Sequence, residues 1–397
     1  MKSNFVFKDS NNITYDFSDV FIRKEFFVDG TLYSWGYNTF SGILGLGDTL
    51  HRSSPTQVGS LTNWFSIAMG SNDVNAIKTD GTLWSWGKNQ YGQLGQNDTT
   101  SRSSPTQVGA LSNWKHISGV GLSYGGIKTD GTLWTWGYAP PVSDGVLGLG
   151  DNVHRSSPTQ VGALSNWKQL SVGSDHMAAI KTDGTLWIWG ANDKGELGDG
   201  TVIPKSSPIQ VGSLTNWASV NCGYGFWGIT AAIKNDGTLW TWGYDAYGML
   251  GLGDAYVSRS SPTQVGSLTN WRQVSCGYSS AAVKNDGTLW TWGNDGGWGT
   301  LGIGNIYATD NYLGSKLSPV QVGTLRNWKE VRVGYRNMMA IKYDGTLWTW
   351  GFNENGKLGL GNIINISSPT QIGPLTYWKT IACGYSSSLA LTHLDLL

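Results

Sequence analysis

The sequence predicts an all-β protein, a seven-bladed β-propeller whose blades are four-stranded antiparallel sheets. The first observation is a tryptophan-rich phrase, DGTLWSWG at residues 80–87, that occurs seven times in the chain. Its copies begin at Asp29, Asp80, Asp130, Asp183, Asp236, Asp286 and Asp344. These starts are roughly 50 to 58 residues apart, a spacing typical of propeller blades. The second observation is composition, because 56 glycines and 22 tryptophans indicate a tightly turned β protein.

Each repeat contains four segments with strand character. In one repeat, WKQLSVG (167–173) alternates apolar and polar residues, and HMAAIK (176–181) follows it. The Asp-Gly turn after HMAAIK predicts a hairpin, because glycine accepts the positive φ that such turns require. The third segment is TLWIWG (185–190), and a glycine-rich loop leads to the fourth, PIQVG (208–212). Each repeat therefore predicts one antiparallel blade.

The third segment explains why blades must stack. Trp187 and Trp189 project from one face of the strand, whereas Leu186 and Ile188 project from the other. Both faces are apolar, so the blade needs a neighbour on each side. Seven such units favour a closed ring.

The ends of the chain predict how the ring closes. The last repeat, which starts near Trp378, contains the first two strands and ends where the DGTLW phrase is expected. The phrase at Asp29 supplies a third and a fourth strand. We therefore expect one blade to be assembled from N- and C-terminal strands. An alternative is that residues 26–28 (FFV) occupy the second-strand position instead.

The predicted domain organisation is an N-terminal docking segment (1–28) followed by the propeller (29–397). Lys8 and Asp9 interrupt any apolar core in the N-terminal segment, which argues against a secretory signal. The chain has no apolar run of about 18 residues, so we expect no membrane span. Lysine and arginine balance aspartate and glutamate at 27 each, without a basic stripe, so we expect no nucleic-acid partner.

Residues 77–95 (IKTDGTLWSWGKNQYGQLG) resemble the regulator of chromosome condensation repeat family, and the resemblance extends from Asp29 to the C-terminus. It implies a seven-bladed propeller. Members of that family include an exchange factor for the small GTPase Ran, secreted β-lactamase inhibitors and ubiquitin ligase modules. The basic tail and inserted wedge of the exchange factor have no counterpart here. The nearly unchanged SSPTQVG and LTNW segments look more like repeat proteins of bacteria and their viruses, and residues 5–27 resemble the start of phage structural proteins.

Few residues suggest chemistry, and we expect no catalytic residue, metal or cofactor and no enzyme activity. The five histidines fall in different repeats without metal-ligand spacing and are expected to be solvated. The three cysteines occupy equivalent small apolar positions, which predicts buried free thiols. The recurrent GLGD segments predict turns whose aspartate accepts hydrogen bonds from backbone N–H groups. Asp48 and Arg52 are expected to pair across such a loop.

Irregular segments interrupt the repeats in only two of the four connections. In an antiparallel blade, the loops between strands one and two and between strands three and four emerge on the same face. The large irregularities all fall in these loops, so we predict that this face binds a partner. Aromatic residues suit such contacts, although the alternative is that they only pack their own loops. The candidate partner-binding residues are Tyr138, Phe226, Trp227, Tyr256, Trp298, Tyr307 and Tyr312.

Two functions are compatible with this pattern. The first is a non-enzymatic structural protein of a phage virion, in the tail, a fibre or the decoration. It would bind other virion proteins or a host-surface glycan or receptor, and it would form homo-oligomers within the assembly. The second is a soluble inhibitor or regulator that binds an enzyme or GTPase through one propeller face. The first predicts a location in the virion, and the second predicts a cytoplasmic one.

Overall fold

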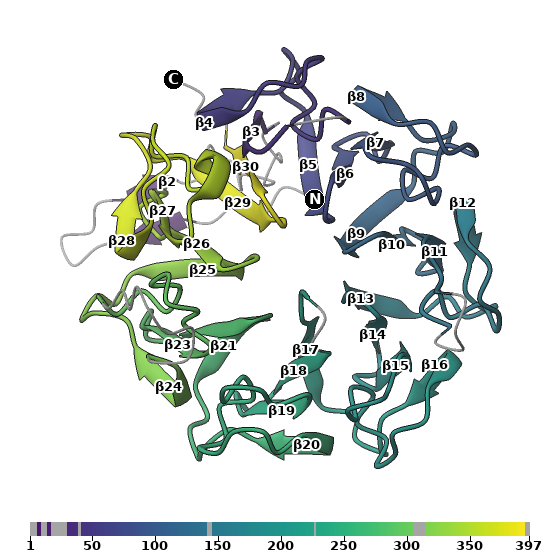
Figure 1. Ribbon diagram of the computed structural model, residues 1–397, viewed down its shortest axis with the longest axis vertical. Helices are drawn as coiled ribbons and strands as arrows, with labels where there is room; N and C mark the ends of the chain where they lie inside the picture. Colours follow the sequence, from purple (N-terminus) through teal and green to yellow (C-terminus); the bar gives the residue numbers. More distant parts are fainter. Residues whose placement is uncertain are drawn as a thin grey trace.

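The computed structural model describes residues 30–38, 41–140, 145–225, 228–304 and 314–393, and the backbone of a short hairpin near the N-terminus. The hairpin pairs β1 (Val6–Lys8) with β2 (Thr14–Asp16). The rest forms seven four-stranded antiparallel sheets arranged in a ring (Figure 1). This confirms the predicted fold class.

The strands occupy equivalent positions in every blade. The first, innermost strands are β5 (Trp64–Met69), β9 (Trp114–Val120), β13 (Trp167–Val172), β17 (Trp217–Cys222), β21 (Trp271–Cys276), β25 (Trp328–Val333) and β29 (Trp378–Cys383). The second strands are β6 (Asp73–Lys78), β10 (Ser123–Lys128), β14 (His176–Lys181), β18 (Ile229–Lys234), β22 (Ser279–Lys284), β26 (Asn337–Lys342) and β30 (Ser387–Thr392).

The two outer positions follow the same pattern. The third strands are β3 (Leu32–Gly36), β7 (Leu83–Gly87), β11 (Leu133–Gly137), β15 (Leu186–Gly190), β19 (Leu239–Gly243), β23 (Leu289–Gly293) and β27 (Leu347–Gly351). The fourth strands are β4 (Arg52–Gln57), β8 (Arg102–Gln107), β12 (Arg155–Gln160), β16 (Lys205–Gln210), β20 (Arg259–Gln264), β24 (Lys316–Gln321) and β28 (Ile366–Gln371). A short 3-10 helix, η1 (Glu354–Gly356), lies between β27 and β28. We number the blades 1 to 6 from β5–β8 to β25–β28, and blade 7 consists of β29, β30, β3 and β4.

Blade 7 closes the ring with strands from both ends of the chain. Strand β30 pairs with β3 in antiparallel register, with Leu391 opposite Leu32 and Ser388 opposite Trp35. The predicted closure is therefore confirmed. The position considered for residues 26–28 is occupied by β30.

The DGT part of the repeated phrase forms a small hydrogen-bonded unit. In blade 1, an Asp80 carboxylate oxygen accepts hydrogen bonds from the Thr82 backbone N–H and hydroxyl, at 2.9 and 2.6 Å. The same hydroxyl accepts a bond from Trp84 Nε1 at 2.8 Å, and Lys78 Nζ lies 3.4 Å from the centroid of the Trp84 ring. Equivalent contacts occur in blades 2 to 6. Each of blades 1 to 6 therefore fixes its own hairpin turn.

The second tryptophan of the phrase joins neighbouring blades. Trp189 is fully buried, and its Nε1 donates a hydrogen bond to the Val146 carbonyl of the preceding blade at 3.0 Å. Gly148 follows in that same loop with a φ of 71°, and a Cβ there would lie 2.6 Å from Trp189 Nε1. The glycine of the GLGD segment is thus required by the close approach of the next blade. Trp187, on the same strand, is only half-buried.

The innermost strands also contact one another around the ring. Ser118 Oγ accepts a hydrogen bond from the Val172 backbone N–H of the next blade, and Ser171 Oγ accepts one from that of Cys222. These side chains satisfy backbone groups on the free edges of the sheets. The described cysteines are free, and Cys222 and Cys276 are buried as predicted. Burial raises the pKa of the Cys222 thiol to about 12, which makes it a poor nucleophile.

Candidate protein-binding face

The ring has two faces with different connections. The loop face carries the loops between first and second strands and those between third and fourth strands. The turn face carries the Asp-Gly hairpin turns and the crossings from one blade to the next. The predicted residues that the structure describes, Tyr138, Tyr256 and Trp298, belong to loops of the loop face.

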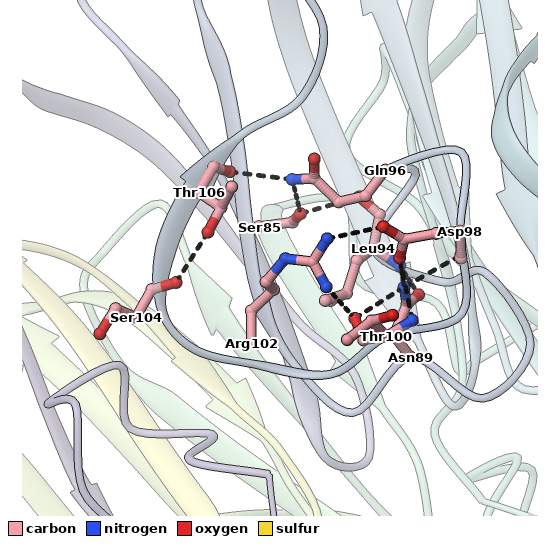
Figure 2. Close-up of polar contacts among 9 residues, drawn as sticks. All are labelled: Ser85, Asn89, Leu94, Gln96, Asp98, Thr100, Arg102, Ser104 and Thr106. Atoms are coloured by element: carbon pink, nitrogen blue, oxygen red, sulfur yellow. Dashed lines mark hydrogen bonds and ion pairs between the residues drawn. The ribbon is translucent and has the colours of Figure 1, made fainter.

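The loops between third and fourth strands are held by internal polar contacts (Figure 2). In blade 1, Asn89 Nδ2 donates hydrogen bonds to the Asp98 carbonyl and carboxylate, and Asn89 Oδ1 accepts one from the Leu94 N–H at 2.9 Å. Asp98 also accepts a bond from the Thr100 N–H and pairs with Arg102 at 2.6 Å. This network gives the loop face a fixed framework.

The expected pairing in the first GLGD loop is confirmed. An Asp48 carboxylate oxygen accepts the Leu50 N–H at 3.0 Å, and its second oxygen lies 2.5 Å from Arg52. The hydrogen bond from Leu50 and the neighbouring Arg52 guanidinium lower the pKa of Asp48. The carboxylates of these turns are therefore structural groups.

The structure describes three of the seven predicted residues, and each lies in a separate aromatic group. Tyr138 of blade 2 lies 4.6 Å from Tyr91 of blade 1 and 5.0 Å from His154, between ring centroids. Trp298 of blade 5 lies 4.6 Å from Phe352 of blade 6. These two side chains are half-buried and pack across blade boundaries.

Tyr256 is the most exposed of the three, at 67%, and it contacts Tyr247 of the same loop. Its φ of 63° lies in the left-handed region, which a non-glycine residue adopts only where the loop requires it. The other four predicted residues, Phe226, Trp227, Tyr307 and Tyr312, lie outside the described residues and stay predictions.

The outer edge of the loop face also carries exposed aliphatic residues, which the repeat pattern did not reveal. Each lies two positions before the first residue of a fourth strand. They are Leu50, Val153, Ile203, Val257 and Ile364. A groove of about 600 Å³ lies on this edge between blades 6 and 7, lined by His51, Ser53, Phe352, Glu354, Asn355, Ile363 and Asn365. The groove begins beside the Trp298–Phe352 pair.

Four tyrosines gather near the centre of the loop face, and they too were not predicted. They occupy the same position in the first loops of blades 4 to 7 and are Tyr224, Tyr278, Tyr335 and Tyr385. Tyr335 stacks on Tyr385 at 4.1 Å and meets Tyr278 edge-on at 5.1 Å. The sequence signal for this cluster is the dipeptide Gly-Tyr, which recurs at equivalent positions of four repeats.

A buried lysine supports this cluster. Lys357 Nζ donates hydrogen bonds to the backbone carbonyls of Tyr335, at 2.5 Å, and Tyr385, at 3.3 Å. Burial, with a smaller contribution from the nearby Arg336, lowers the pKa of Lys357 to about 7. The tyrosine loops of blades 6 and 7 are thus joined by one side chain of blade 6.

The turn face is regular but not purely polar. The crossings that lead into blades 1 to 6 each carry one leucine that is 42–51% exposed. These residues are Leu61, Leu111, Leu164, Leu214, Leu268 and Leu325. They recur with the LTN segment and are equivalent by position. The two faces therefore differ in variety rather than in the presence of apolar side chains.

A buried histidine is engaged in a structural contact. His176 is buried, which corrects the expectation of a solvated residue; its Nε2 lies 2.8 Å from the Thr230 hydroxyl. Burial lowers the pKa of His176 to about 4, so it is neutral at physiological pH.

Within the described ranges, no three His, Cys, Asp or Glu side chains are grouped in a way that could hold a metal ion. The same ranges contain no helix long and apolar enough to cross a membrane.

Comparisons with known proteins agree with the architecture. A model of the RCC1-like domain matches residues 143–395, and the regulator of chromosome condensation (RCC1) repeat matches residues 29–76 and 80–120. The crystal structure of Prp20p from Saccharomyces cerevisiae superposes with a TM-score of 0.79 and 20% identity, over 93% of both chains. Human WBSCR16 gives a TM-score of 0.77 at 20% identity, over 92% of this chain and all of the other. At this identity, the likeness shows the fold.

Two plant proteins are similar in sequence. The ultraviolet-B receptor UVR8 of Arabidopsis thaliana is 30% identical over 84% of this chain, which spans 63% of the receptor. The mitochondrial RCC1 domain-containing protein RUG3 of the same plant is 30% identical over 85% of this chain and 81% of its own length. For the human ubiquitin ligase HERC2 the match covers 56% of this chain but only 5% of the ligase. These relatives are eukaryotic, and the predicted bacterial or phage type gains no support from them. The chain belongs to the regulator of chromosome condensation repeat family.

Proposed function

We propose that the protein is a non-enzymatic regulator or inhibitor that binds an enzyme or a GTPase through the loop face. The observation that carries the proposal is the combination of a rigid framework and varied apolar tips on that face. The Asn89–Asp98–Arg102 network fixes a loop, whereas side chains such as Tyr256 extend from such loops into solvent. Preformed loops lose little conformational entropy when they bind, which favours affinity.

Family membership supports a protein partner. Prp20p binds Gsp1p and histones, and yeast RCC1 has been crystallised bound to Kap60. The basis for extending protein binding to this chain is the shared ring together with its own exposed aromatic and aliphatic loop residues. The activity of the ligase HERC2 is not part of the proposal, because the match covers 5% of that protein.

The virion role remains a prediction from the resemblance of residues 5–27 to phage structural proteins. None of the relatives named above supports it. The docking role of residues 1–28 is likewise untested, since most of that segment lies outside the described residues.

Site-specific photo-crosslinking tests which face binds. A photoreactive amino acid replaces Tyr256 on the loop face, and in a second variant it replaces Leu164 on the turn face. We expect the probe at position 256 to capture a stoichiometric partner and the probe at 164 to capture none. A partner captured only from position 164 would contradict the proposal.

The captured partner then allows affinity and activity measurements. Trp298→Ala and Tyr256→Asn should each weaken binding by about tenfold or more if they lie at the centre of the interface. Asparagine is chosen at 256 because it tolerates a positive φ. Leu164→Ala is the matched control and should leave affinity unchanged. A regulator also alters the rate of the partner's reaction; a complex that leaves this rate unchanged would refute regulation while preserving binding.

A further inference from the structure

The central channel of the ring is open at the turn face and narrowed at the loop face. Its walls are the seven innermost strands, and its volume is about 820 Å³. At the loop-face end, Tyr224 of blade 4 reaches across the ring: its hydroxyl lies 3.4 Å from Ser71 Oγ of blade 1, and its ring lies 6.5 Å from that of Tyr385 of blade 7. Side chains from opposite sides of the ring thus meet at this end, which leaves the other end as the entrance.

The wall of this channel carries a net positive charge, although the whole chain has a net charge of zero. Its lining includes five basic residues, namely Lys115, Arg272, Lys329, Arg332 and Lys379. The single acidic residue of the lining is Glu330, which pairs with Arg332 at 3.1 Å and accepts a hydrogen bond from the Thr380 hydroxyl. One of the five positive charges is therefore neutralised within the wall.

The topology places four of these side chains at the entrance. Each innermost strand runs from the turn face toward the loop face, and its second residue is Lys115 in β9, Arg272 in β21, Lys329 in β25 and Lys379 in β29. Arg272 donates hydrogen bonds to the Trp328 and Lys329 carbonyls. Among the described residues, no carboxylate lies within ion-pairing distance of the other three.

The lysines at the entrance are close enough to influence one another. Burial lowers the pKa of Lys379, and the neighbouring Lys329 lowers it further. His116, which faces the same channel, has its pKa lowered by burial, and Arg332 and Lys115 add to this effect. Like charges gathered without a counter-charge destabilise the folded state unless an anion joins them.

We propose that the central channel binds a small anion that carries several phosphate groups and enters from the turn face. The volume falls within the range of small-molecule pockets, about 300 to 1,000 Å³. A concave site lined by one sign of charge concentrates counter-ions. Lysine ammonium groups bind phosphate as point charges. A compact anion with several phosphate groups could therefore contact several of the basic side chains at the entrance at once. This site is separate from the loop face, so it stands or fails independently of the proposed regulator function.

Calorimetric titration of the full chain tests the site with two probes, inositol hexakisphosphate and inorganic tripolyphosphate. We expect one molecule to bind per chain, with an affinity that falls as salt concentration rises. The double variant Lys329→Gln/Lys379→Gln removes two unpaired charges at nearly constant size and should bind at least about tenfold more weakly. Lys194→Gln, which removes an exposed charge from the loop face, is the control and should bind as the wild type does.

Thermal unfolding of each variant verifies that the ring is intact, and Lys115→Gln serves as a second channel variant if the double variant unfolds. A hexaglutamate peptide distinguishes phosphate from general negative charge; binding of the peptide alone would refute the phosphate class. Absence of binding by the wild type, or equal binding by wild type and channel variants, would overturn the proposal.

Discussion

The loop face and the turn face are made by the same repeats, yet only one of them varies. On the turn face, the Asp80–Thr82–Trp84 unit and its equivalents form the same hydrogen bonds in six blades. On the loop face, an Asn or Asp side chain accepts a hydrogen bond from a leucine N–H in six blades, but the loop tips range from Leu50 to Tyr256. The difference shows that blade-to-blade packing constrains the repeated residues and leaves the loop tips free to vary, and these tips are where we propose that a partner binds.

The largest expected effect comes from opening the ring. Deletion of residues 378–397 removes β29 and β30, which form half of blade 7. The neighbouring blades would then expose buried apolar faces, so we expect no cooperative thermal transition. Deletion of residues 1–28 is the control and should leave the transition in place. A cooperative transition at the wild-type temperature after the C-terminal deletion would show that closure is unnecessary.

Substitutions of the two tryptophans of β15 separate the stability gained from packing between blades from that gained at the blade surface. Trp189 is fully buried and bonded to the preceding blade, so Trp189→Ala should cost about 3 to 5 kcal/mol of unfolding free energy. Trp187 is half-buried, and Trp187→Ala should cost about half as much. Denaturant titration of both variants measures the difference. Equal losses would mean that the joint between blades is not the principal contribution of the phrase.

Alanine substitutions at two glycines with positive φ separate the cost of a steric clash from the cost of backbone strain. Gly148→Ala places a Cβ 2.6 Å from Trp189 Nε1, so strain and overpacking together should cost about 3 kcal/mol. At Gly162 nothing lies within 4 Å of the added Cβ, and Gly162→Ala should cost about 1 kcal/mol from its φ of 59° alone. Thermal melting of the pair measures both. If Gly162→Ala is the more destabilising change, the proposed role of the GLGD glycine is wrong.

A smaller, pH-dependent effect is expected at Asp73, which is buried at the loop-face end of β6. Burial raises its pKa from 3.8 to about 7, although hydrogen bonds oppose the shift. Between these pH values the folded protein holds more protons than the unfolded chain, so stability must fall as pH rises from about 4 to 7. Asp73→Asn should therefore raise the melting temperature near pH 8 and change it little near pH 4. An identical change at both pH values would contradict the buried, protonated carboxyl.

Much of the fold was predictable because it depends on short-range rules. The Asp-Gly turns, the strand pattern and the incomplete repeat at Trp378 each correspond to a local requirement, and all three are confirmed. The pairing of Asp48 with Arg52 was predictable for the same reason, since the residues are four positions apart.

The site was harder to predict because it depends on which repeated residues meet in space. Tyr224 of blade 4 reaches blades 1 and 7 only because closure of the ring places these two blades opposite blade 4. The burial of His176 follows from the stacking of blades, and its residue type gave no sign of it. The charge of the channel likewise appears only when the ring brings basic residues of four distant strands, Lys115, Arg272, Lys329 and Lys379, to one cavity.

Hydrogen–deuterium exchange of the complex with the captured partner tests the central claim most directly. Our account predicts slowed exchange in the loops between third and fourth strands, including residues 244–258 and 294–304, and unchanged exchange in the crossings that carry Leu164 and Leu214. Protection confined to those crossings, with the loops exchanging as in the free protein, would contradict the assignment of the loop face as the binding surface.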